Sequence, residues 1–164
     1  MKMKSLMVAL SLAIPVAASA QNGARPVTGE MKDAFATIEK NVEQIAFKPE
    51  KERWTANVEL WRIRLANTGK LNKDEFKMME PLFATMEDNV SRLLEPQEKE
   101  RWVSNHAMWQ LGMGISGLSP EDAAAKADFT MTVMQANVAR IPGGEEKERW
   151  AANVVLWKGI LGRK

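Results

Sequence analysis

The sequence predicts an all-α fold of three tandem antiparallel helical hairpins, six helices in all, and three observations carry this prediction. The chain has 164 residues, 45% apolar and 27% charged, which is enough for one domain with a substantial core. One pattern recurs three times at a spacing of 48 residues. Within each repeat, apolar residues recur at helical spacing, and capping residues, Pro and Gly fall between the apolar stretches.

The first twenty residues are predicted to be a signal peptide. Lys2 and Lys4 precede a short apolar run, Leu6 to Pro15, and Ala18-Ser19-Ala20 fits the small-x-small rule for cleavage. We expect cleavage after Ala20 and an exported protein, periplasmic or extracellular. Residues 21–27 are then an N-terminal extension, and 28–164 form one repeat domain with units at about 28–69, 70–117 and 118–164.

Removal of the leader leaves a formally neutral chain, because Lys+Arg falls from 23 to 21 against 21 Asp+Glu. A nucleic-acid surface therefore has no electrostatic support, and we expect no nucleic-acid partner. No later stretch reaches about 20 apolar residues, so no membrane span is expected either.

Capping and breaking residues place the helices in order. The expected N-caps of the first helix in each unit are Thr28, Asn72 and Ser119. The residues that end the first helix or open the second are Pro49, Pro96 and Pro142. Gly69 and the segment 112–117 separate the hairpins, which leaves about 15–20 residues for each helix. The hairpins form either a short α-solenoid-like stack, which we favour, or a compact bundle.

The run Glu-Lys-Glu-Arg-Trp opens the second helix of each unit, and an Asn and another Trp follow at fixed spacing. The repeated residues are Arg53, Arg101 and Arg149; Trp54, Trp102 and Trp150; Asn57, Asn105 and Asn153; and Trp61, Trp109 and Trp157. Every Trp of the protein belongs to this pattern. We expect the rings to pack between hairpins, with a surface aromatic platform as the alternative.

All six helices place an Asn inside an apolar stripe, at the second position of an i, i+3, i+4, i+7 pattern. A buried amide needs hydrogen-bond partners, so we expect each Asn to pair with a facing Asn or with backbone and to fix the register between helices. The alternative is a groove in which Asn amides and Trp rings bind a sugar or peptide. For the repeated Arg we expect contact with an adjacent helix end or loop, and a ligand-binding row of three Arg is the alternative.

His106 stands where the other five helices have Val. We expect a packing residue with a lowered pKa, because partial burial disfavours the charged imidazolium. A haem site with Met ligation, or copper binding by Met, is the less favoured interpretation.

No catalytic motif is present: the chain has no Cys, a single His, no nucleophile elbow and no Gly-rich phosphate loop. We therefore expect a non-enzyme without a cofactor, acting as an interaction module for a protein or peptide partner. The alternative is a carrier of a sugar, haem or metal that uses the Trp/Asn face. The candidate contact residues are the three repeated Arg, the first Trp and the Asn of each repeat, and His106; the oligomeric state stays open.

Overall fold

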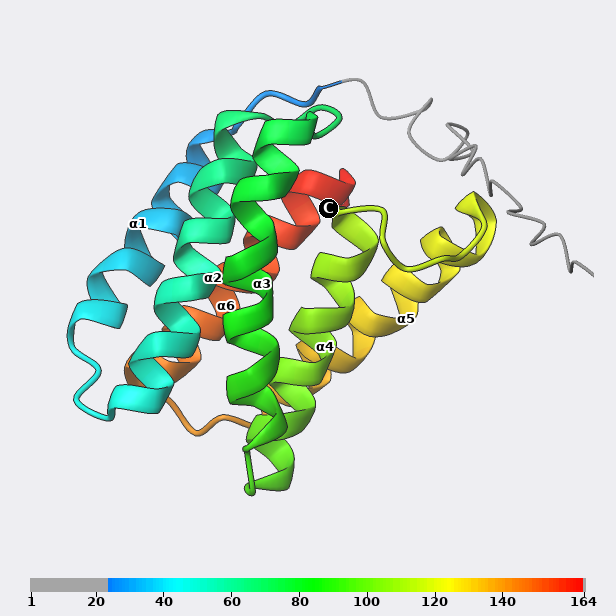
Figure 1. Cartoon of the computed structure of the whole chain (residues 1–164). Coiled ribbons are helices and arrows are strands. Elements are labelled where there is room, and N and C mark those ends of the chain that lie inside the picture. The colour runs from blue at the N-terminus through cyan, green and yellow to red at the C-terminus, as the bar shows by residue number, and fades with distance from the viewer. Residues whose placement is uncertain (1–23, 164) are drawn as a thin grey trace, which may run out of the picture.

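A computed structural model of the chain describes residues 24–163, and the predicted signal peptide lies outside them. The described part contains six helices and no strand, which confirms the all-α class (Figure 1). The helices are α1 (Gly29–Glu43), α2 (Lys48–Ala66), α3 (Lys73–Ser91), α4 (Pro96–Gly112), α5 (Pro120–Ala139) and α6 (Gly144–Leu161). None of the helices in residues 24–163 is long and apolar enough to cross a membrane.

The predicted N-caps are confirmed for all three first helices. The side chains of Thr28, Asn72 and Ser119 each accept a hydrogen bond from a backbone N–H in the first turn of the helix that follows. Asn72 also forms a reciprocal capping box with Glu75. Two of the predicted breakers lie in the first turns of second helices, and the third lies in the turn before α6: Pro49, Pro96 and Pro142.

The helices form an inner and an outer set. The inner helices α2, α4 and α6 meet around one axis, where their Trp residues are in mutual contact. Each outer helix packs mainly on the inner helix that precedes it in the chain: α3 on α2, and α5 on α4. The first helix, α1, packs in the same way on the last, α6, and this contact closes the ring (Figure 1). We call these three contacts seams.

The closed ring decides between the two architectures that the sequence allows. The compact bundle is the observed one, and our preference for an open stack was wrong. An open stack would leave the apolar faces of α1 and α6 in water, whereas closure buries them against each other. Gly159 permits the close approach in this seam, because a Cβ there would lie 2.5 Å from Sδ of Met31. The equivalent residues of the other inner helices are Ile63 and Leu111.

Candidate functional site

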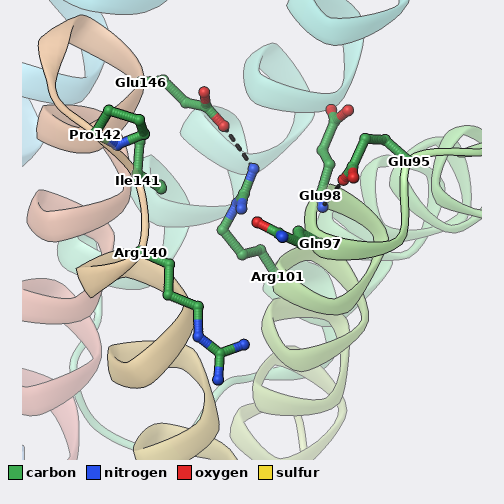
Figure 2. Close-up of a pocket in the computed structure, with 8 residues that line it drawn as sticks. All are labelled: Glu95, Gln97, Glu98, Arg101, Arg140, Ile141, Pro142 and Glu146. Carbon is green, nitrogen blue, oxygen red and sulfur yellow. Dashed lines mark hydrogen bonds and ion pairs between the residues drawn. The ribbon is translucent and has the colours of Figure 1, made fainter.

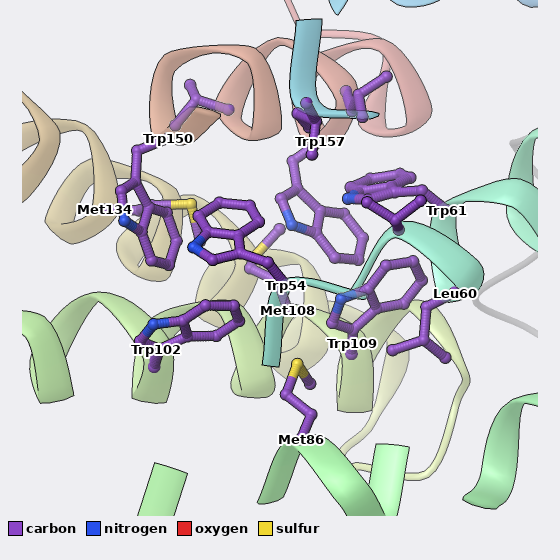
Figure 3. Close-up of a cluster of buried hydrophobic side chains, with 14 of the residues drawn as sticks. Trp54, Leu60, Trp61, Met86, Trp102, Met108, Trp109, Met134, Trp150 and Trp157 are labelled. Carbon is purple, nitrogen blue, oxygen red and sulfur yellow. The ribbon is translucent and has the colours of Figure 1, made fainter. Parts of the chain in front are cut away.

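The six Trp side chains form two layers across the axis of the bundle (Figure 3). The first layer is the triangle Trp54, Trp102 and Trp150, with ring centroids 4.9–5.0 Å apart. The second is the triangle Trp61, Trp109 and Trp157, with centroids 4.6–4.7 Å apart. Each ring is at most 1% exposed, so the rings are core and form no surface platform.

A closed ring of three Asn side chains lies between the Trp layers. Nδ2 of Asn105 donates to Oδ1 of Asn57 at 2.9 Å, Asn57 donates to Asn153 at 3.1 Å, and Asn153 donates to Asn105 at 3.0 Å. Each Oδ1 also accepts the indole N–H of one Trp of the second layer, at 2.8–3.0 Å. The predicted pairing of facing Asn residues is confirmed for the inner helices.

A second ring, of ion pairs, lies at the N-terminal ends of the inner helices. Arg53 donates to Glu98 at 2.5 Å, Arg101 to Glu146 at 2.7 Å, and Arg149 to Glu50 at 2.7 Å. Each guanidinium also lies 5.5–6.0 Å from the centre of a first-layer Trp on the next inner helix. The expected reach of the Arg to an adjacent helix end is confirmed.

The Asn residues of the outer helices differ from one another. The amide of Asn41 donates to Glu148 on α6 at 2.9 Å, and that of Asn89 donates to a backbone carbonyl of its own helix at 3.0 Å. Nδ2 of Asn137 is buried and has no hydrogen-bond partner among the described residues. The expected facing Asn is therefore found in the inner helices only. Asn89 has the backbone partner that was the other expectation, and Asn41 and Asn137 donate to neither kind of partner.

His106 is a packing residue. Its ring stacks on Phe83 of α3 at a centroid distance of 4.3 Å and an interplanar angle of 22°. Burial lowers the pKa of His106, and Glu87, with Oε1 3.7 Å from Nε2, opposes this shift only in part. In the described part of the chain, no three His, Cys, Asp or Glu residues lie close enough to hold a metal ion.

The sequence candidates therefore lie mainly in the interior of the bundle, whereas parts of the surface differ from one repeat to the next. An open groove of about 290 Å³ lies between the start of α4 and the turn from α5 to α6 (Figure 2). Arg101 of α4 lines this groove and is paired with Glu146. Arg140, directly after α5, also lines it, and its guanidinium points away from Glu146 (Figure 2). Arg140 donates to Oδ1 of Asn137 at 3.3 Å and has no carboxylate partner in residues 24–163.

The other two seams carry no such unpaired cation at the position of Arg140. The equivalent residue after α1 is Gln44, and the equivalent residue after α3 is Arg92. Arg92 forms an ion pair at 2.7 Å with Asp88 of its own helix. The groove therefore contains a cation, Arg140, whose equivalent in one repeat is uncharged and in the other is paired with a carboxylate.

The outward face of α5 is the second surface that departs from the repeat. Five exposed residues lie on one line along α5, and we call them the α5 stripe: Ala125, Phe129, Thr132, Ala136 and Ala139. The exposed Lys126 and Asp128 lie beside this line, with Nζ of Lys126 5.7 Å from the centre of the Phe129 ring. The equivalent residues are Gly29, Asp33, Ala36, Lys40 and Glu43 on α1, and Lys77, Pro81, Ala84, Asp88 and Ser91 on α3. Only the α5 stripe lacks charge, and its Phe129 is 64% exposed.

Sequence reasoning missed both surfaces because it sought function in what the repeats share. A signal was present, since residues 129–139 contain no charged side chain while the equivalent segments of α1 and α3 contain several. No protein-family model, no curated protein and no solved structure matches the chain.

Proposed function

We propose that the protein is a non-catalytic interaction module that binds a protein partner through the α5 stripe. The observation that carries the proposal is the difference between equivalent faces: α1 and α3 present charges along this line, and α5 presents none. Charged residues are depleted and aromatic residues enriched at the centres of protein interfaces. An exposed, uncharged stripe with Phe129 along its middle fits such a centre.

The rival function, a carrier of a sugar, haem or metal on the Trp/Asn face, has no specific observation in its favour. The Trp rings are buried against one another, and the amides of the inner Asn residues are already bonded to one another and to indole N–H groups. A ligand on this face would have to open the core and break these bonds. We therefore rank the carrier below the interaction module.

For localisation, we propose that the protein acts after export and cleavage of residues 1–20. The support is the positive start, the short apolar run and the small residues before Gln21. N-terminal sequencing of the protein from the culture medium or the periplasm tests this, and we expect Gln21 as the first residue. An intact Met1 in the exported fraction would contradict it.

The binding proposal is tested by affinity capture with the immobilised mature protein, using fluid from its own secretory compartment. Phe129→Lys and Thr132→Glu place charges in the α5 stripe. Ala36→Glu is the matched control, because Ala36 occupies the position of Thr132 on the outward face of α1. We expect a protein that the native chain and Ala36→Glu retain and that both α5 variants retain at least tenfold less.

Two results would contradict the proposal. One is capture of the same proteins by the native chain and by all three variants, which are the four forms compared. The other is a small molecule in the eluates that all four forms retain while no protein is enriched, which would favour the carrier.

A further inference from the structure

One buried amide group in the α5–α4 seam has no partner. Asn137 is 3% exposed, and its Nδ2 donates no hydrogen bond to any described residue. Buried polar groups in folded proteins are nearly always paired, so an orphaned amide N–H calls for an explanation. The explanation comes from the same position in another seam.

The α1–α6 seam shows which group satisfies this amide. Asn41, the equivalent of Asn137, donates from Nδ2 to the carboxylate of Glu148 at 2.9 Å. The residue equivalent to Glu148 in the α5–α4 seam is Glu100, which is exposed and makes no hydrogen bond to Asn137. The α1–α6 seam therefore supplies a carboxylate to this amide, and the α5–α4 seam does not.

A cation stands beside the unpaired amide. Arg140 donates to Oδ1 of Asn137 at 3.3 Å, and Nδ2 is the amide atom left without a partner among the described residues. Arg140 is also one of the residues that line the groove of Figure 2, and no carboxylate of the described part pairs with it. The α1–α6 seam, which already holds an internal carboxylate, has the neutral Gln44 at the position of Arg140. The unpaired amide and a cation without a carboxylate partner thus lie in the same seam.

We infer that Asn137 and Arg140 form a binding site for a carboxylate, supplied by an acidic side chain of the protein partner, and that the side chains covering Nδ2 of Asn137 move aside when it binds. A carboxylate accepts from an amide N–H and a guanidinium together, and hydrogen bonds to charged groups are stronger than neutral ones. The site lies at the C-terminal end of α5, next to Ala139 of the stripe. The source of the carboxylate rests on the proposed function, whereas the chemistry of the site does not.

The test is an NMR titration of the ¹⁵N-labelled mature protein, read at the side-chain NH₂ signals of asparagine. The probes are sodium acetate, the peptide acetyl-Gly-Glu-Gly-amide and its Gln analogue, each added at constant ionic strength with sodium chloride. We expect a saturable shift of the Asn137 signal with acetate and, at lower concentration, with the Glu peptide. Chloride and the Gln peptide should leave it in place, and so should Asn41, whose amide is occupied by Glu148.

Matched variants connect the response to the site. Arg140→Gln should weaken binding of the Glu peptide at least tenfold, because the guanidinium is lost. Arg92→Gln removes the equivalent side chain of the α3–α2 seam and should leave the affinity unchanged. The NH₂ signals of the Asn ring report whether each variant keeps its fold.

Three results would overturn the inference. If the Asn137 signal ignores every carboxylate but moves in Glu100→Gln, Glu100 is its partner and no site exists. If Arg140→Gln and Arg92→Gln weaken binding equally, the effect is general charge. If acetate binds as tightly as the Glu peptide, the site serves small free carboxylates. None of these results depends on the α5 stripe, so failure of the capture experiment and failure of this titration are distinguishable.

Discussion

Each of the three repeats contributes one inner and one outer helix. The inner helices keep more of the repeated residues than the outer helices do. The inner helices α2, α4 and α6 keep the Arg, both Trp and the Asn in every copy, whereas the outer helices keep the Asn-Val pair and little else. Each of these Trp and Asn residues contacts its own equivalents on the two other inner helices, and each Arg contacts a Glu and a Trp of the next inner helix. A change in one copy therefore removes contacts from the other copies. An outer helix lies mainly on one inner helix and meets water on its other side. Because the repeated inner residues contact one another, a change in one copy is costly, and the pattern is kept in the inner helices. The outer helices make no such mutual contacts, so their residues differ more from copy to copy.

The largest effect should follow removal of one ring from a Trp layer. Trp102 is 1% exposed and contacts two other Trp rings, so Trp102→Ala should lower the free energy of unfolding by about 3–5 kcal/mol. Phe129→Ala, on the outer face of α5, should change it by less than about 0.5 kcal/mol. Urea denaturation of the two variants measures the contrast. Similar losses in both would mean that the inner layer has no special role in stability.

The next effect should follow a break in the Asn ring. Asn105→Ala leaves the N–H groups of Asn153 and Trp157 without an acceptor, and each buried unpaired donor costs about 1–3 kcal/mol. We expect a loss of about 2–4 kcal/mol, although the variant makes the core more apolar. The matched outer change, Asn89→Ala, removes a bond within one helix and should cost less than about 0.5 kcal/mol. A stabilised Asn105→Ala protein would refute the role of the ring.

The inner set was largely predictable from the sequence, and the outer surface was not. Spacing placed Trp102 and Asn105 on one helix face, and the cost of a buried amide predicted that Asn would meet Asn. Closure of the ring was not predictable, because the contact of α1 with α6 depends on packing angles that no local pattern encodes. The free amide of Asn137 was hidden too, since the same Asn-Val pair in α1 finds a carboxylate. The repeat predicts what its copies share, and the candidate sites lie where the copies differ.

An intermediate effect should follow the loss of one charge from the Arg–Glu ring. The side chain of Arg53 is 3% exposed and depends on Glu98, so Glu98→Gln weakens the partner of a buried cation. We expect a loss of about 1–3 kcal/mol in the free energy of unfolding. Glu59→Gln is the control on the water-facing side of the inner helix α2, because its ion pair with Arg62 is exposed and should contribute at most about 0.5 kcal/mol. Equal losses, or a loss from Glu98→Gln that high salt abolishes, would place Glu98 among ordinary surface charges.

The smallest effect concerns His106, the one inner position of the Asn-Val pattern that departs from Val. Burial against Phe83 lowers the pKa of His106 below its value of about 6.5 in the unfolded chain. Between the two values the unfolded chain binds more protons than the folded protein. The stability that neutral His106 contributes is therefore present at pH 7 and is lost as the pH falls below about 6.5.

His106→Val should remove this dependence and restore the residue that the other five helices carry. Thermal melting at pH 5 and pH 7 measures it: the difference in Tm between the two pH values should be smaller in His106→Val than in the native protein. Glu87→Gln is the opposite change, because Glu87 raises the pKa of His106, and its removal should widen the difference. Addition of copper, zinc or haem provides the control for a ligand role. A rise in Tm with one of these that disappears in His106→Val would show that His106 is a ligand, and the break in the inner repeat would then mark a binding site rather than a packing position.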